Sequence, residues 1–183
     1  MDGIDRTPGI RPRLTLVGRL DGLARASFPA ISTVLLMLLA AAPFGLPMQA
    51  ALLPGFTFSS IWFWSLFRPG SLPPPIVFLI GVIFDLLAYS PLGVGVLTLL
   101  IISAVGLRLR PVLGAQRFPV LWLAFVVVAA AAVLCGWAAG SVLQYRRLPL
   151  APAFFEFSVT VAIFPALWAL FTRVQGPAHQ GRT

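Results

Sequence analysis

The sequence has little charge for its length and few of the side chains on which most active sites depend. Only 10% of its 183 residues are charged, whereas about a quarter are charged in a typical soluble domain. It contains five acidic residues, one histidine, one cysteine and no lysine. The single cysteine, Cys135, excludes an intramolecular disulfide, and its apolar neighbours favour a packing role.

These shortages exclude the common catalytic and cofactor sites. The one histidine, His179, lies alone in a polar C-terminal segment, so no Cys–His or Ser–His–Asp set is available to activate a nucleophile. The chain has no His-x-x-x-His pair, no acidic cluster that could hold a metal and no glycine-rich phosphate loop that ends in a lysine. We therefore expect a protein that is not an enzyme and that binds no metal or cofactor.

Hydrophobic residues, in contrast, are abundant and come in blocks. They make up 59% of the chain, and its mean hydropathy is +0.97. Each block is close to the length of about 20 residues that a helix needs to cross a bilayer. We predict an all-α integral membrane protein, a polytopic bundle of about six transmembrane helices. The predicted spans are 28–47, 50–67, 74–90, 92–107, 118–143 and 150–172.

Three regions follow from these spans. Residues 1–27 form a basic N-terminal tail, in which residues 13–28 have the weakly amphipathic spacing of an interfacial helix. Residues 28–172 form the transmembrane helical domain, and residues 173–183 form a C-terminal tail. We expect both tails to be cytoplasmic, because of the distribution of the arginines along the chain.

The arginines predict the orientation of the bundle. They lie between the apolar blocks rather than on one face of an amphipathic helix, which argues against nucleic-acid binding. Loops on the cytoplasmic side of a membrane carry an excess of positive charge. With both termini on that side, all 13 arginines except Arg146 and Arg147 face the cytoplasm. We therefore predict an N-in, C-in topology, with arginines in contact with membrane lipid.

Aromatic and small residues suggest where the spans meet the headgroups and each other. Trp62, Trp64 and Phe67 cluster just before Arg68, which predicts an aromatic belt at the level of the lipid headgroups. Gly136 and Gly140 follow an alanine run in the fifth span and allow another helix to approach closely.

Two acidic residues, Asp85 and Glu156, lie inside predicted spans. At 1.5 Å per residue both are roughly 8–9 Å below the outer surface, on the side of Arg146 and Arg147. Our hypothesis is an outer-face charge layer made by Asp85, Glu156, Arg146 and Arg147. Two alternatives stay open, since each acid could reach water or cap a backbone group, or could belong to a ligand or proton site.

Asp85 is also part of a pattern of short motifs. Gly81-x-x-x-Asp85 runs into a Pro-Leu-Gly turn, and an aromatic segment that ends in proline precedes it. On these motifs, and in its size and layout, the chain resembles the MreD family of bacterial rod shape-determining membrane proteins. The matching residues are Trp64, Pro69, Gly81, Asp85, Pro91, Leu92 and Gly93.

The resemblance implies a function that the residues alone do not. It implies a non-enzymatic subunit of the elongation machinery in the bacterial inner membrane, without a cofactor. Its partners would be MreC, the MreB filament, and RodA with its penicillin-binding transpeptidase. The subunit would help couple the filaments to lateral peptidoglycan synthesis and so regulate cell shape.

The same resemblance leaves one alternative. The family is similar in fold to the substrate-binding subunits of energy-coupling-factor vitamin transporters, so the chain could be a small-molecule transport component. Such a pocket should bring several polar groups together. The candidates in this sequence are few, chiefly Asp85, Glu156, Gln144 and Tyr145.

Overall fold

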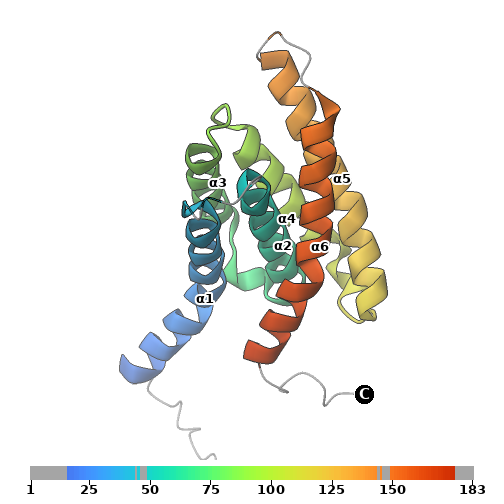
Figure 1. The fold of residues 1–183 in the computed structure, drawn as a ribbon. Helices are drawn as coiled ribbons and strands as arrows, with labels where there is room; N and C mark the ends of the chain where they lie inside the picture. The colour runs from blue at the N-terminus through green and yellow to red at the C-terminus, as the bar shows by residue number, and fades with distance from the viewer. Residues whose placement is uncertain (1–15, 44, 46–48, 144, 146–148, 176–183) are drawn as a thin grey trace, which may run out of the picture.

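The computed structural model describes residues 16–43, 45, 49–143, 145 and 149–175. These residues form six α-helices and no strand, which confirms the all-helical prediction (Figure 1). The helices are α1 (Leu16–Ala41), α2 (Leu52–Phe67), α3 (Pro74–Ala88), α4 (Val94–Leu113), α5 (Phe118–Leu143) and α6 (Leu150–Gln175). Short 3-10 turns, η1 (Gln49–Ala51) and η2 (Pro69–Ser71), precede α2 and α3.

Four helical segments of the described chain are long and apolar enough to cross a membrane. They are Gln49–Phe67, Val94–Leu113, Phe118–Leu143 and Leu150–Arg173. The apolar parts of α1 and α3, Ser27–Ala41 and Pro74–Ala88, are shorter. The chain is therefore a membrane protein by composition and helix length.

The helices follow the predicted apolar ranges, and their ends differ by several residues. The largest difference is in α1, which begins at Leu16, inside the segment predicted to be a tail. Proline inside a helix removes a backbone hydrogen bond and favours a bend, and α1 contains Pro29. Figure 1 shows the N-terminal part of α1 leaning away from the bundle.

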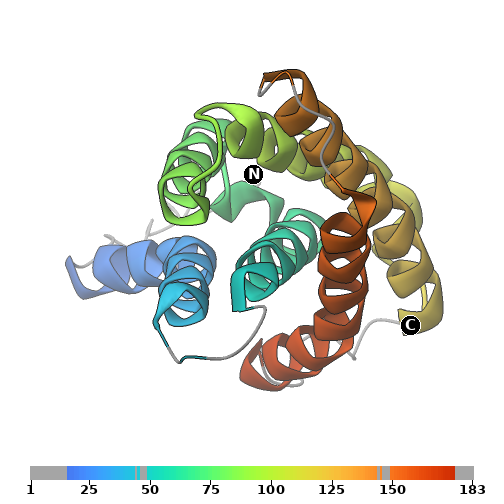
Figure 2. The same ribbon diagram turned by 45° about the horizontal axis from the view of Figure 1, so that its top comes forward.

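Helix α2 lies at the centre of the bundle. It contacts each of the other five helices, and Figure 2 shows the others arranged around it. Small residues allow this close packing, because a side chain built on Gly106 of α4 would begin 2.8 Å from Cβ of Ser65 in α2. On the opposite side, Gly55 of α2 packs against Thr160 and Ile163 of α6.

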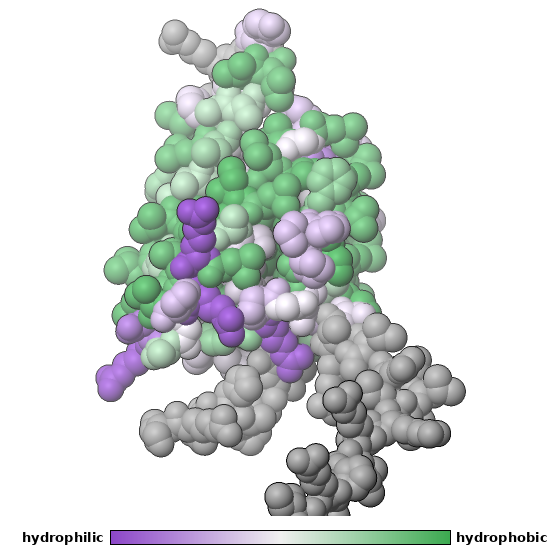
Figure 3. Space-filling model, turned by 180° about the vertical axis from the view of Figure 1, so that it is seen from behind, coloured by the Kyte–Doolittle hydropathy of each residue, from purple (hydrophilic) through white to green (hydrophobic). Residues whose placement is uncertain are grey.

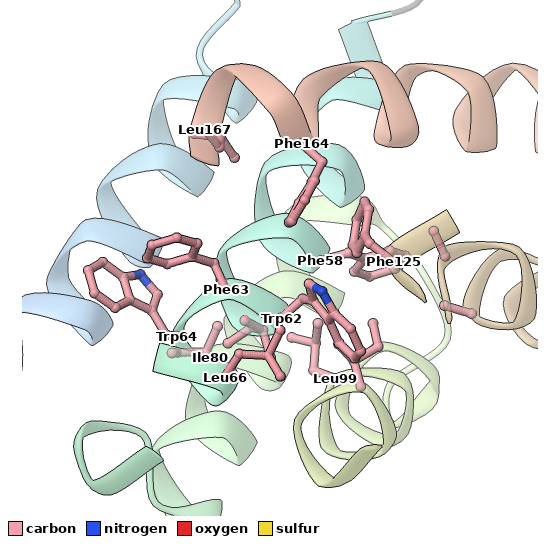
Figure 4. Close-up of a cluster of buried hydrophobic side chains, with 14 of the residues drawn as sticks. Phe58, Trp62, Phe63, Trp64, Leu66, Ile80, Leu99, Phe125, Phe164 and Leu167 are labelled. Carbon is pink, nitrogen blue, oxygen red and sulfur yellow. The ribbon is translucent and has the colours of Figure 1, made fainter. Parts of the chain in front are cut away.

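The core of the bundle is rich in aromatic side chains, many of which come from α2 (Figure 4). The ring of Trp62 lies 6.3 Å from that of Phe125, which stacks on Phe164 at 4.4 Å. The ring of Trp64 lies 4.9 Å from that of Phe171. These contacts join α2 to α5 and α6, so aromatic packing holds the C-terminal hairpin against the central helix.

The predicted aromatic belt at the headgroups is wrong for both tryptophans. Trp62 and Trp64 are 0% exposed, and Phe67 is only partly exposed. The reason is the central place of α2, since the surrounding helices bury most of its side chains. A position close to Arg68 in sequence therefore does not bring these rings to the lipid surface.

The two ends of the bundle differ in charge. We call the end where α2, α4 and α6 finish the basic end, because all arginines with described side chains lie there. They are Arg68, Arg108, Arg110, Arg117 and Arg173. The two acids with described side chains, Asp85 and Glu156, lie toward the opposite end, which we call the carboxylate end. Figure 3 shows hydrophilic side chains gathered at the base of the molecule, below a broad apolar surface.

Candidate functional site

Asp85 lies in the last turn of α3 and binds the first turn of α4. Its Oδ1 atom accepts hydrogen bonds from the Ser90 hydroxyl and the Gly95 N–H, each at 2.7 Å. Its Oδ2 atom accepts one from the Gly93 N–H at 2.7 Å and a longer one from the Val96 N–H at 3.4 Å. The first N–H groups of a helix have no partner within the helix. Asp85 therefore caps α4 from the preceding helix.

The turn between the two helices has the backbone that this cap requires. Helix α3 ends at Ala88. The next residue, Tyr89, is left-handed at φ 50°, and Gly93 adopts φ 103°, where a side chain would be strained. Pro91 and Leu92 lie between them, and the Leu92 side chain is 72% exposed. The turn thus folds α4 back onto α3 and leaves an apolar side chain at its tip.

Two glycines allow α3 and α4 to approach closely below the turn. A Cβ atom on Gly81 would lie 2.6 Å from the Cα of Val96. A Cβ on Gly95 would collide with Oδ1 of Asp85 and with the Phe84 ring. Gly81 and Asp85 are one helical turn apart and both touch the first turn of α4. Gly95 is a site residue that the sequence reasoning missed.

The family-motif residues do not form a single site. Gly81, Asp85, Pro91, Leu92 and Gly93 come together in the α3–α4 hairpin. Trp64 is in the core near the other end of the bundle, and Pro69 begins η2 at the basic end. The motif therefore describes a capped hairpin and, separately, the connection from α2 to α3.

A cavity of about 1070 Å³ opens at the carboxylate end, and all six helices contribute to its walls. Most of the lining is apolar, and Glu156 is its one charged residue among the described residues. Representative lining residues are Ala40 and Ala41 of α1, Leu53 and Phe58 of α2, Phe84 and Leu87 of α3, Val94 and Thr98 of α4, Ala132 and Trp137 of α5, and Phe155 and Glu156 of α6.

The predicted charge layer is only partly described by the structure. Asp85 and Glu156 lie toward the same end, but Asp85 is bonded to the turn while Glu156 lines the cavity. Arg146 and Arg147 are outside the described residues, as is Gln144. The hydrogen bonds of Asp85 match one of the roles that the sequence left open, which is the capping of backbone N–H groups.

The two glycines of α5 lie in different surroundings. Gly136 lines the cavity, and a Cβ atom there would meet no atom within 4 Å. Gly140 is buried. Within the described residues, no helix packs closely on Gly136, so its small size leaves space in the cavity wall.

The chemistry available at these places is limited in the described part of the chain. No group of three His, Cys, Asp or Glu side chains comes together there. The carboxylate end offers an apolar cavity with one acid, and beside it a carboxylate whose bonds hold two helices together. An apolar cavity of this kind is suited to recognition of an apolar partner or ligand.

Comparison with known proteins identifies the family of the chain. The model of the family described as rod shape-determining protein MreD matches residues 22–174. No curated protein and no solved structure matches the chain. The matched range covers all of α2 to α5 and most of α1 and α6, so it includes both the capped hairpin and the cavity.

Proposed function

Because the chain belongs to the MreD family and thus to the proteins that determine rod shape, we propose that it is a membrane scaffold subunit of the elongation machinery. In this role it helps couple MreB filaments and MreC to lateral peptidoglycan synthesis. The family match over residues 22–174 is the observation that carries the proposal. MreD is not a family of known enzymes, in keeping with a scaffold.

The geometry of the α3–α4 hairpin supports a scaffold. Its membrane-embedded carboxylate is used to cap a helix, and the turn it holds carries Tyr89 and Leu92 at the surface. Tyr89 is 97% exposed. A capped turn with exposed aromatic and apolar side chains is suited to contact with another membrane protein. We propose MreC, MreB, and RodA with its penicillin-binding transpeptidase as partners.

The charge of the two ends supports a topology for this subunit. With the basic end in the cytoplasm, both termini are cytoplasmic and the bundle crosses the bacterial inner membrane six times. The cavity and the α3–α4 turn then face the periplasm. Four helical segments are long enough for this, and the shorter apolar parts of α1 and α3 pack against α2.

The cavity favours one alternative function. A chamber of about 1070 Å³ lined by all six helices is the arrangement expected of a transport component with a substrate cup, similar to a vitamin-transporter subunit. Its walls offer few polar groups, chiefly Glu156, Gln49 and Ser90. For this reason we favour the scaffold.

Affinity purification from native membranes tests the proposal. We expect the tagged protein to recover MreC, and the exchange Leu92→Glu to reduce that recovery while the protein level is unchanged. Phe154→Glu is a control, because Phe154 is equally exposed at 71% but lies on α6, away from the turn. Recovery of transporter ATPase subunits in place of shape-determining proteins would favour the transport alternative.

A further inference from the structure

A second cleft lies at the basic end, away from the cap and the cavity. It has a volume of about 530 Å³ and is formed where α2 and α4 finish. Leu66 and Phe67 of α2 and Leu107 of α4 give it apolar walls. Arg110, from the last turn of α4, also lines it and is exposed. Apolar walls thus meet a guanidinium group in one place.

No described carboxylate can neutralise this guanidinium. Asp85 and Glu156 are the only acids with described side chains, and both lie toward the opposite end of the bundle. Arg108 lies half a turn before Arg110, and Arg117 follows the cleft at the start of α5. The cleft therefore lies in a region of positive charge, which favours binding of an anion from outside the described residues.

The stem of Arg110 has a defined position beside the cleft. It lies over Gly114, since a Cβ atom on Gly114 would be 3.8 Å from Cγ of Arg110. A guanidinium binds phosphate oxygens in a bidentate manner, and basic sites between transmembrane helices are suited to lipid headgroups. A soluble anion would use the charge and leave the apolar walls of Leu66, Phe67 and Leu107 without a partner.

We propose that this cleft binds an anionic phospholipid, with its headgroup phosphate on Arg110 and an acyl chain against Leu66, Phe67 and Leu107. The inference goes beyond the scaffold role and does not depend on it. The lipid would come from the leaflet that covers the basic end. Bound there, it would fill the space between the ends of α2 and α4.

Lipid binding to the purified full-length protein tests this proposal. The protein in detergent is titrated with phosphatidylglycerol or phosphatidylcholine, and bound lipid is counted by native mass spectrometry. We expect phosphatidylglycerol to bind more tightly, and Arg110→Gln to weaken it about fivefold, as expected for one arginine near a membrane surface. Arg173→Gln is the matched control, because it removes the same charge at the same end outside the cleft.

Two further variants distinguish binding in the cleft from general electrostatic attraction between anionic lipid and the basic end. Ala115→Trp fills the cleft and keeps every arginine, so it should also weaken phosphatidylglycerol binding. Arg110→Lys keeps the charge but loses the bidentate geometry, so it should fall between wild type and Arg110→Gln. Equal effects of Arg110→Gln and Arg173→Gln would overturn the proposal. Equal affinity for the two lipids would also overturn it. So would displacement of phosphatidylglycerol by inorganic phosphate that is equally easy from wild type and from Ala115→Trp, because the bound lipid would then not occupy the cleft.

Discussion

Asp85 caps the first turn of α4 and packs directly against Gly95 in that turn. The Gly95 N–H donates to Oδ1 of Asp85 at 2.7 Å, and the same oxygen occupies the place where a side chain on Gly95 would begin. The two residues are ten positions apart and belong to different helices. A carboxylate inside a membrane helix thus has a structural task, which is to hold the start of α4 against the end of α3.

Asp85→Asn should destabilise the protein by about 2 kcal/mol. The Asp85 carboxylate accepts from Ser90, Gly93 and Gly95, whereas an asparagine has one acceptor oxygen and turns its NH₂ group toward another donor. The lost negative charge also removes a favourable interaction with the N-terminus of α4. Thermal or denaturant unfolding of the purified protein in detergent measures the difference.

Glu156→Gln is the control for this measurement, since it also replaces an acid toward the carboxylate end. Glu156 lines the cavity and does not cap α4, so the stability should stay close to that of wild type. If Asp85→Asn unfolds at the same temperature or denaturant concentration as wild type, the cap does not stabilise the hairpin.

Gly81→Ala should destabilise the hairpin, while Gly136→Ala should not. A Cβ on Gly81 would lie 2.6 Å from backbone of Val96, which only a shift of α3 away from α4 can relieve. Overpacking of this kind costs about 1–3 kcal/mol. At Gly136 the same atom meets nothing within 4 Å. Unfolding of the two variants side by side gives the comparison, and equal stability would mean that α3 and α4 are less closely packed than described.

Trp62→Ala should cost about 3 kcal/mol, since it empties a fully buried site between α2 and α5. Trp62→Phe should be much milder, because the Trp62 Nε1 atom has no hydrogen-bond partner within the described residues. Unfolding in detergent again gives the values. An aromatic belt at the headgroups would give a different pattern, in which Trp62→Ala is nearly neutral.

Most of the helical layout could be predicted, because each apolar block is close to the length of a span. The arrangement of the helices could not, since hydropathy does not tell a central helix from a peripheral one. The span Gln49–Phe67, which contains α2, has the lowest mean hydropathy of the four long spans and is yet the most buried. Its serines and threonine, such as Thr57 and Ser60, are tolerated because it does not face lipid. That polar content was the available signal for its central place.

Part of the candidate site could also be predicted from the sequence. Capping was among the alternatives for Asp85, but the sequence does not say which N–H groups it reaches. Gly95 was missed because its contact with Asp85 depends on how the turn folds α4 back. The Gly93-Val94-Gly95 spacing was the signal that could have identified it.

Labelling of single cysteines should reveal the topology. On a Cys135→Ala background, Leu92→Cys should react with a membrane-impermeant maleimide in intact spheroplasts, because Leu92 is exposed in the α3–α4 turn. Gly70→Cys, at the exposed basic end, should react only after lysis. Labelling of Gly70→Cys before lysis would reverse the orientation proposed from the arginines.

Depletion of the protein in its native host tests the central claim most directly. Cell width is recorded during depletion and after complementation with the wild-type gene or with Asp85→Asn. We predict that depleted cells widen and lose their rod shape, that wild type restores the width, and that Asp85→Asn restores it less well. Unchanged width on depletion, together with loss of uptake of a nutrient, would contradict the account.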